Sequence, residues 1–331
     1  MFLKIRNLIF NFVLIIRTII AISSNRWLVS WLSLEINLII LIPLLVNKIS
    51  FNATNITIKY FLTQAFASLL IISSFIIFFM FRFANSIIIN NELIIVAIII
   101  KSGIPPFQFW LPQVLELRNL FQSFIILTWQ KIAPFVFLSY IFSRSILLFL
   151  IAAAIVGCMG GLNQNSIIKI IAYSSIIHAS WIISAILVSE KTWICYFLAY
   201  ATITLAFIIF ITNFKFKKIS SFLKNYIGVT TKIIFSVNIL SIGGLPPFLG
   251  FVAKIIVIQK IITVKMVRLL ILIVSASFIS LLYYTRICYA LFLTGGKGIK
   301  LKPGVAKTEK NLPNWTRIGI NIIALPLVLL T

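Results

Sequence analysis

Long apolar runs, separated by short polar connections, make up most of the chain. Runs of roughly 20 residues are long enough to cross the hydrocarbon core of a bilayer as α-helices. The pattern therefore predicts an all-α polytopic membrane protein, whose last span is short and contains Pro326. The predicted spans are 3–22, 27–47, 58–80, 88–107, 120–142, 145–161, 166–188, 193–213, 232–259, 268–293 and 315–330.

Two of these spans contain the same interruption. The pattern Gly-x-Pro-Pro-Phe occurs at 103–107 and again at 244–248. Proline has no N–H to donate, and its ring displaces the carbonyl four residues earlier, so each pair of prolines predicts a broken helix. Paired breaks in the two halves of a membrane protein are typical of a transport site. The predicted helix breaks are at Pro105, Pro106, Pro246 and Pro247.

Composition agrees with the membrane interpretation. The chain is 61% hydrophobic and only 10% charged, whereas a globular domain averages about 25% charged residues. There are 29 lysines and arginines against five acidic residues, all of them glutamate. This basic surface suits anionic phospholipid headgroups such as those of cardiolipin. It does not suit nucleic acid, because the basic residues are scattered between spans and form no continuous face.

The basic residues also predict an orientation. With eleven spans, the connections on the side of the N-terminus hold more lysine and arginine than those on the other side. Positive charge is enriched on the inner side of membrane proteins. We therefore expect the N-terminus to lie inside and the C-terminus outside.

A few ionisable side chains lie inside the predicted spans, each near mid-span on a different helix. Charge at that depth is costly and is by default a functional hypothesis. Groups that gain or lose a proton when a neighbour's charge changes are the parts of a proton relay. The candidate relay residues are Glu35, Lys101, Lys131, His178 and Lys254. Hydroxyl residues expected to carry connecting water are Ser102, Thr128, Ser174 and Ser175.

Structural explanations compete with the relay. Glu35 and one lysine can form an ion pair that only serves the fold. Lys254 lies nearer a span end and can extend its amine to the headgroups, and a lone His178 is more often a hydrogen-bonded core residue. However, one glutamate cannot neutralise three lysines, and this favours proton transfer for Lys101 and Lys131.

Metal chemistry is not expected in this chain. Cys158, Cys195 and Cys288 lie far apart, no Cys-x-x-Cys pattern occurs, and there is one histidine. Iron–sulfur clusters and zinc sites need several such ligands at short spacing. We therefore expect neither a metal nor a cofactor here.

The stretches around these residues carry a family resemblance. The chain resembles the subunit 2 family of mitochondrial NADH:ubiquinone oxidoreductase (respiratory complex I), in its arthropod form, over roughly residues 20–293 in order. The matching stretches are Ser24–Leu28, Leu34–Asn37, Lys59–Gln64, Lys101–Gly103 with Pro106–Phe107, Thr128–Pro134, Gly160–Gln164, Ala172–Ile176 with His178, Ser241–Phe251 and Arg286–Tyr289.

The resemblance implies an antiporter-like fold with two inverted five-helix repeats, each containing a broken helix. The repeats would occupy 1–142 and 145–293, and a basic loop with a C-terminal helix would occupy 294–331. It also implies the mitochondrial inner membrane, with the N-terminus in the matrix and the C-terminus in the intermembrane space.

The resemblance further implies a core membrane-arm subunit that contributes to proton translocation. Lys101 would be the central proton carrier, tuned by Glu35, Lys131 would connect the two halves, and Lys254 would lie near the outlet. NADH, FMN, iron–sulfur clusters and ubiquinone would be used by other subunits, with the other membrane-arm subunits as partners.

Two other functions remain open on the residues alone. One is a stand-alone cation/proton antiporter with the same fold, and the other is a structural membrane subunit that pumps nothing. Sodium coordination needs several carboxylates, and Glu35 is the single acid that lies away from the ends of the predicted spans. The sequence does not separate a pumping from a structural role.

Overall fold

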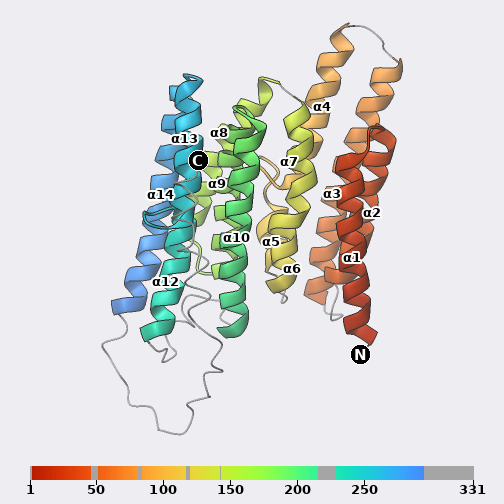
Figure 1. Cartoon of the computed structure of the whole chain (residues 1–331). Coiled ribbons are helices and arrows are strands. Elements are labelled where there is room, and N and C mark those ends of the chain that lie inside the picture. The colour runs from red at the N-terminus through yellow and green to blue at the C-terminus, as the bar shows by residue number, and fades with distance from the viewer. Residues whose placement is uncertain are drawn as a thin grey trace. The chain divides into compact units, whose positions relative to one another are not determined.

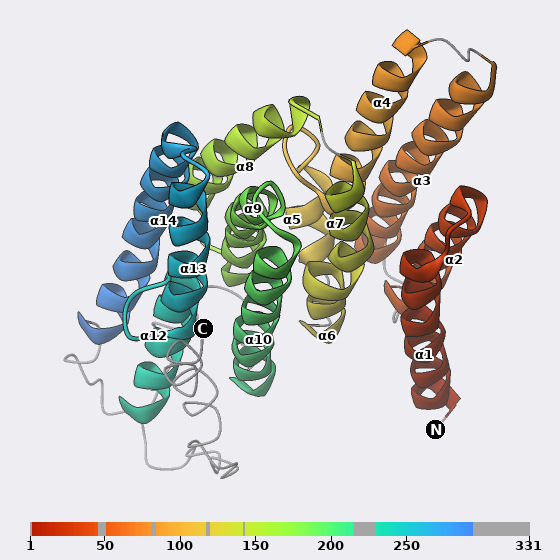
Figure 2. The same cartoon turned by 45° about the horizontal axis from the view of Figure 1, so that its top comes forward.

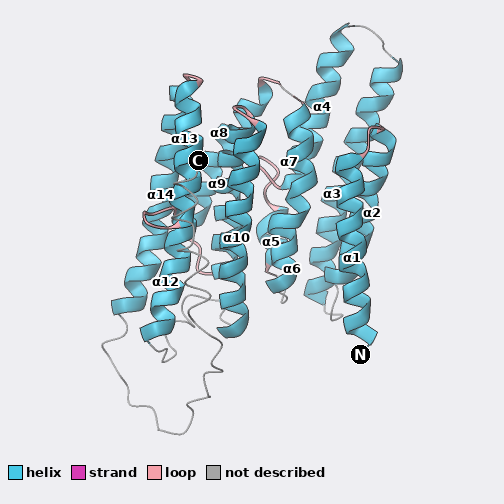
Figure 3. Ribbon diagram, in the orientation of Figure 1, coloured by secondary structure: helices cyan, strands magenta, loops and turns pink. Residues whose placement is uncertain are grey.

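The computed structural model describes residues 2–45, 51–80, 84–116, 120–141, 143–214 and 229–293, which form helices joined by short turns (Figures 1 and 3). Apart from their ends, helices satisfy their backbone hydrogen bonds internally, which hydrocarbon requires because it offers no water. Six described helices are long and apolar enough to cross a membrane, and three further apolar helices are shorter. The predicted span at 315–330 lies outside the described residues.

Contacts divide the chain into two compact units, Met1–Val156 and Gly157–Thr331. The boundary falls inside one helix, α8 (Ser145–Gly161). The predicted repeats at 1–142 and 145–293 would meet at the start of that helix, and they stay a prediction. Each unit is described by itself below.

Unit 1 is built from consecutive helices that pack as neighbours. α1 contacts α2, α2 contacts α3 and α3 contacts α4, while α7 contacts both α1 and α4 (red to yellow in Figure 1). Its helices are α1 (Phe2–Ser23), α2 (Trp27–Leu45), α3 (Phe51–Met80), α4 (Ala84–Ser102), α5 (Trp110–Leu115), α6 (Leu120–Phe124), the π-helical turn η1 (Ile125–Trp129) and α7 (Gln130–Tyr140).

Unit 2 is built around α9, nearly all of whose residues are buried. α10, α13 and α14 all contact α9, and α12 contacts α10, α13 and α14 (green to blue in Figure 2). A helix that is buried on nearly every side belongs at the centre of a bundle. The helices are α9 (Ile167–Ile186), α10 (Glu190–Phe214), α12 (Val229–Gly243), α13 (Leu249–Thr263) and α14 (Val267–Leu293).

Glycine lets the end of α8 approach α9 closely. A Cβ atom on Gly157 would lie 2.6 Å from the side chain of Ile177, and one on Gly160 would lie 2.3 Å from the Tyr173 ring. Small residues at membrane helix contacts allow such backbone approach, because lipid supplies no hydrophobic drive between helices. This contact fixes the turn that leads into α9.

The predicted spans agree with the described helices except at three places. The span predicted at 58–80 begins at Phe51, because its Asn and Thr residues are accommodated in the first turns of α3. The span predicted at 88–107 stops being helical at Ser102, and the next helix begins only at Trp110. The span predicted at 232–259 is divided into two helices, α12 and α13, with a turn between them. α4 begins at Ala84 and ends at Ser102, so Lys101 lies at its C-terminal end.

Candidate functional site

The first interruption is a defined helix end. α4 ends at Ser102, and Gly103 follows with φ of 72°. This left-handed conformation suits glycine because it has no Cβ. The Gly103 N–H donates to the Ile100 carbonyl at 3.2 Å and the Ile104 N–H to the Ile99 carbonyl at 3.1 Å. Such bonds close a helix in a Schellman-type turn.

Two side chains donate hydrogen bonds to backbone carbonyls at this break. The Gln64 amide donates to the Lys101 carbonyl at 3.3 Å, and the Trp110 indole N–H donates to the Ile100 carbonyl at 3.2 Å. The Trp110 ring packs edge-on against Tyr60 with ring centroids 5.5 Å apart. The broken backbone is therefore surrounded by protein and hydrogen-bonded to it, as membrane depth requires.

The second interruption repeats this geometry in unit 2. α12 ends at Gly243, Gly244 has φ of 77°, and the Leu245 N–H donates to the Leu240 carbonyl at 3.2 Å. The two proline pairs therefore occupy equivalent places, in the turn that follows a left-handed glycine. The next helix, α13, begins at Leu249.

Lys254 is bonded directly to this second break. Its Nζ donates to the Gly243 carbonyl at 2.7 Å and lies 5.8 Å from the centroid of the Trp181 ring. A Cβ atom on Gly244 would lie 2.9 Å from the same Nζ, so this glycine also makes room for the amine. Lys254 is 7% exposed, and its amine points into unit 2 rather than to the headgroups.

Lys131 follows the irregular part of its helix. The π-helical turn η1 ends at Trp129, and π turns occur frequently at functional sites because they reorient the residues that follow. Pro134, inside α7, has no N–H to donate to the Gln130 carbonyl. Lys131 is 3% exposed.

Lys101 and Lys131 line one cavity of unit 1, which has room for water. Gln130 also lines it, and among the described residues its buried amide nitrogen has no hydrogen-bond partner. A buried polar group without a partner is costly, so water is the expected occupant. The residues that line the cavity are Leu34, Leu38, Tyr60, Gln64, Lys101, Ser102, Trp110, Ile126, Gln130, Lys131 and Pro134.

Glu35 acts on this cavity from its edge. It is half-buried, next to the lining residue Leu34, and its carboxylate attracts the Lys101 amine electrostatically. No ion pair joins the two side chains, both of which the structure describes. The two charges therefore interact across a gap, which suits tuning of Lys101 better than a permanent ion pair does.

His178 lies at the middle of α9, and it is 5% exposed. Its Nδ1 is 2.9 Å from the Tyr196 hydroxyl, and its ring centroid is 5.0 Å from that of Tyr200. These contacts satisfy the structural expectation of a bonded core histidine, and they join the imidazole to two tyrosine side chains.

The predicted relay residues thus form two groups, one in each unit. Unit 1 brings Glu35, Lys101 and Lys131 to one cavity, and unit 2 holds His178 and Lys254. A continuous row through both units stays a prediction. Among the described residues, no three or more His, Cys, Asp or Glu side chains gather where they could hold a metal ion.

Sequence reasoning missed several polar residues that complete these groups. Gln64 and Gln130 stand inside stretches that carry the family resemblance, so a signal existed, although it gave no reason for a role. Buried tyrosines carry no such signal, because a tyrosine within a span often lies in an interfacial belt. The missed tyrosines are Tyr60, Tyr196, Tyr200, Tyr283 and Tyr284.

Comparison of sequences with known proteins gives consistent matches. A family model described as NADH:quinone oxidoreductase/Mrp antiporter, TM, matches residues 24–280. The chain is 40% identical to NADH-ubiquinone oxidoreductase chain 2 of Anopheles gambiae, covering 88% of this chain and 87% of that protein. It is 38% identical to the protein of the same description from Locusta migratoria, covering 86% and 85%.

Comparison of structures supports the same fold. A chain in respiratory complex I from Thermus thermophilus has a TM-score of 0.77 at 22% identity, covering 95% of this chain and 74% of that chain. A chain of an archaeal membrane-bound sulfane sulfur reductase has a TM-score of 0.80 at 16% identity, covering 96% and 73%. The predicted all-α, antiporter-like fold is therefore confirmed, without a fixed number of helices.

Proposed function

Because the chain belongs to the chain 2 family of NADH-ubiquinone oxidoreductase, within the antiporter-like membrane proteins, we propose that its buried charged residues move protons across the membrane. It is a core membrane-arm subunit of respiratory complex I. The observation that carries the site assignment is the water-sized cavity shared by Lys101 and Lys131 beside a broken helix.

In unit 1, the cavity supplies the path and the two lysines supply the proton carriers. Charge in a low-dielectric site responds strongly to a neighbouring charge. A change that strengthens the attraction between Glu35 and the Lys101 amine therefore favours proton uptake at Lys101. A change that weakens this attraction favours proton release. Water between the amines, hydrogen-bonded to Gln130, passes the proton to Lys131.

In unit 2, Lys254 is the corresponding carrier. Its bond to the Gly243 carbonyl holds the amine at the second break, at the end of α12. The protonated amine is stabilised there by the helix C-terminal carbonyl and the Trp181 face. Loss of a proton weakens both interactions, so the charge on Lys254 is coupled to the geometry of the break.

The redox steps belong to other subunits. NADH oxidation with FMN and iron–sulfur clusters, and ubiquinone reduction, would occur outside this chain, and charge changes would arrive through neighbouring membrane-arm subunits. Anionic phospholipid such as cardiolipin would bind its basic connections. No role with nucleic acid is proposed.

The orientation proposed for the inner membrane places the N-terminus in the matrix and the C-terminus in the intermembrane space. The excess of basic residues in connections on the N-terminal side supports it. Protease added to the matrix face of inverted vesicles is expected to cut the chain within 294–313. Cutting that occurs only from the intermembrane-space face contradicts the orientation.

Two rival functions make different predictions. A stand-alone cation/proton antiporter needs coordinating carboxylates, and no described residue adds an acid to Glu35 at the unit 1 cavity. A structural subunit would tolerate neutral substitutions at Lys101 and Lys131 without any loss of pumping. The 40% identity to a chain 2 protein over most of both chains favours the complex I subunit.

Co-migration tests the assignment most directly. After mild solubilisation of the membranes and native separation, we expect this chain to travel with NADH dehydrogenase activity, because membrane-arm subunits stay bound to the redox arm. A chain that migrates alone contradicts the proposal. Cation-driven proton exchange in liposomes that contain only this chain would then identify an antiporter.

A further inference from the structure

The cavity of unit 1 takes residues from η1 and α7 in an irregular spacing. These residues are Ile126, Gln130, Lys131 and Pro134. The last three stand four, five and eight residues after the first, whereas one face of a regular α-helix repeats at three, four and seven residues. Each of them therefore stands one position later than a regular helix would place it.

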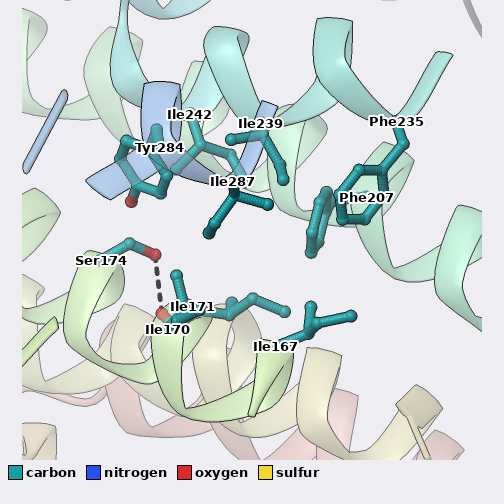
Figure 4. Close-up of a pocket in the computed structure, with 10 residues that line it drawn as sticks. All are labelled: Ile167, Ile170, Ile171, Ser174, Phe207, Phe235, Ile239, Ile242, Tyr284 and Ile287. Atoms are coloured by element: carbon teal, nitrogen blue, oxygen red, sulfur yellow. Dashed lines mark hydrogen bonds between the residues drawn. The ribbon is translucent and has the colours of Figure 1, made fainter. Parts of the chain in front are cut away.

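A cavity in unit 2 has the regular spacing. Figure 4 shows this cavity and the uninterrupted helix α9 along one side of it. The α9 residues that line it are Ile167, Ile170, Ile171 and Ser174. The last three stand three, four and seven residues after the first, and the Ser174 hydroxyl donates to the Ile171 carbonyl of its own helix at 2.7 Å. Of these two cavities, only that of unit 1 has the shifted spacing.

The hydrogen bonds of η1 account for the shift. The Gln130 N–H donates to the Ile125 carbonyl five residues earlier, whereas an α-helix joins residues four apart. The turn therefore holds one residue more than a regular helix would. The Thr128 hydroxyl donates to the Phe124 carbonyl at the start of the turn, at 2.8 Å, and such bonds often accompany bent helices.

The extra residue decides which side chains reach the cavity. In a regular helix continuing from Ile126, Trp129 and Gln130 would take the next positions of the cavity face. Lys131 would then lie outside that face. With η1 in place, Lys131 lines the cavity and Trp129 does not.

Trp129 is instead anchored on α1. Its indole N–H donates to the Thr18 hydroxyl at 3.0 Å, and this hydroxyl donates in turn to the Ile15 carbonyl at 2.8 Å. The second bond orients the lone pairs of the Thr18 oxygen, which accept from Trp129. Thr18 is 2% exposed, so bulk water does not compete for the bond.

A second anchor lies before η1. The Gln122 amide donates to the Leu44 carbonyl in the last turn of α2. α1 and α2 pack against each other, so the segment from Gln122 to Trp129 is held at both ends by one helix pair. A rotation of α7 into the regular spacing would have to break one of these two bonds.

We propose that Thr18 and Trp129 are positioning residues for Lys131. Their bond keeps the extra residue in η1, and the resulting spacing brings Lys131 to the cavity that Lys101 also lines. The proposal rests on the proposed function, since that is where Lys131 is a proton carrier. Thr18 and Trp129 transfer no proton themselves and act through the place of the Lys131 side chain.

Removing the bond from either side tests this role. Trp129→Phe keeps a ring without the N–H, and Thr18→Val keeps the branched shape without the hydroxyl. In assembled complex I in liposomes, we expect each variant to lower proton transfer through this subunit about 10-fold or more, because a small misplacement of a reacting group can cost about 10²-fold. The proton-to-electron ratio should fall toward that of Lys131→Met.

Three further variants make the result specific. Trp193→Phe is the matched control, because Trp193 is 6% exposed and its indole nitrogen has no hydrogen-bond partner among the described residues. It should pump as the unaltered chain does. Thr18→Ser keeps the accepting oxygen and should restore the ratio. The double variant of Thr18→Val with Trp129→Phe should pump no worse than either single variant, because both remove the same bond, whereas two independent defects would add.

The reference variant Lys131→Met separates two kinds of failure. If it lowers the ratio while Trp129→Phe and Thr18→Val match Trp193→Phe, the bond does not position Lys131 and the proposed function stands. A lower melting temperature with an unchanged ratio leads to the same conclusion, since a purely structural bond gives that result. If Lys131→Met changes nothing either, the proposed function fails. Should Trp129→Phe prevent assembly, Thr18→Val decides, because it removes the same bond without altering η1 or α7.

Discussion

Replacing Lys101 with methionine is expected to stop proton transfer through this subunit. The variant keeps the length of the side chain and removes the amine proposed above to take up a proton beside Glu35. Positioned proton carriers contribute roughly 10²–10⁴-fold to transfer rates, so the proton-to-electron ratio of the complex should fall by the share that this subunit carries. The measurement is the ratio of protons moved to NADH oxidised in liposomes that contain the assembled complex.

Lys101→Met should lower proton pumping without lowering the stability of the assembled complex. A lysine at mid-membrane costs about 2.5–3.5 kcal/mol on insertion scales, and methionine does not carry this cost. Lys101→Met should therefore assemble at least as well as the unaltered chain. Lys59→Met is the matched control, because Lys59 is exposed on α3, where its amine bonds Gln113 at 3.0 Å. An unchanged ratio in assembled Lys101→Met complex contradicts the role of Lys101.

Two substitutions at Lys254 should separate its structural and chemical roles. Lys254→Met leaves the Gly243 carbonyl without its donor, and an unsatisfied buried carbonyl costs about 1–3 kcal/mol. Lys254→Gln can still donate to that carbonyl, but its amide does not exchange protons. We expect lower thermal stability of the complex for Lys254→Met alone and reduced proton pumping for both.

The comparison of Lys254→Met with Lys254→Gln decides whether Lys254 serves the helix break, the proton path or both. If Lys254→Gln pumps as the unaltered chain does, Lys254 serves the helix break and not the proton path. Equal thermal stability of Lys254→Met and Lys254→Gln would mean that the bond to Gly243 does not hold the break. Either result can be read from the same two preparations, by melting temperature and by proton-to-electron ratio.

The sequence located the two helix interruptions with little ambiguity. A proline removes a backbone donor wherever it stands, so the pairs at 105–106 and 246–247 predict the same event twice. The left-handed glycines before them, Gly103 and Gly244, follow from the same local chemistry. The ends of α4 and α12 are therefore local properties, which a single stretch of sequence carries.

The bond partners at the interruptions were not predictable in this way. Trp110, Gln64 and Lys254 supply the donors, and they lie 10, 37 and 11 residues away from the carbonyls that they bind. Such pairings depend on which helix faces end up in contact. The sequence placed Lys254 near a span end, where snorkelling competed with a functional role, and the fold turned its amine inward to Gly243.

The sequence by itself determined that this protein lies in a membrane, where most of its helices lie along the chain, and that few charged residues fall inside them. These follow from local hydrophobicity and backbone chemistry, which act residue by residue. Only the tertiary structure decided that Lys101 and Lys131 share one cavity, that Glu35 acts on it across a gap, and that the tyrosines of α10 and α14 converge on α9. Convergence of this kind depends on helix packing, because residues far apart in the chain meet only when their helices do.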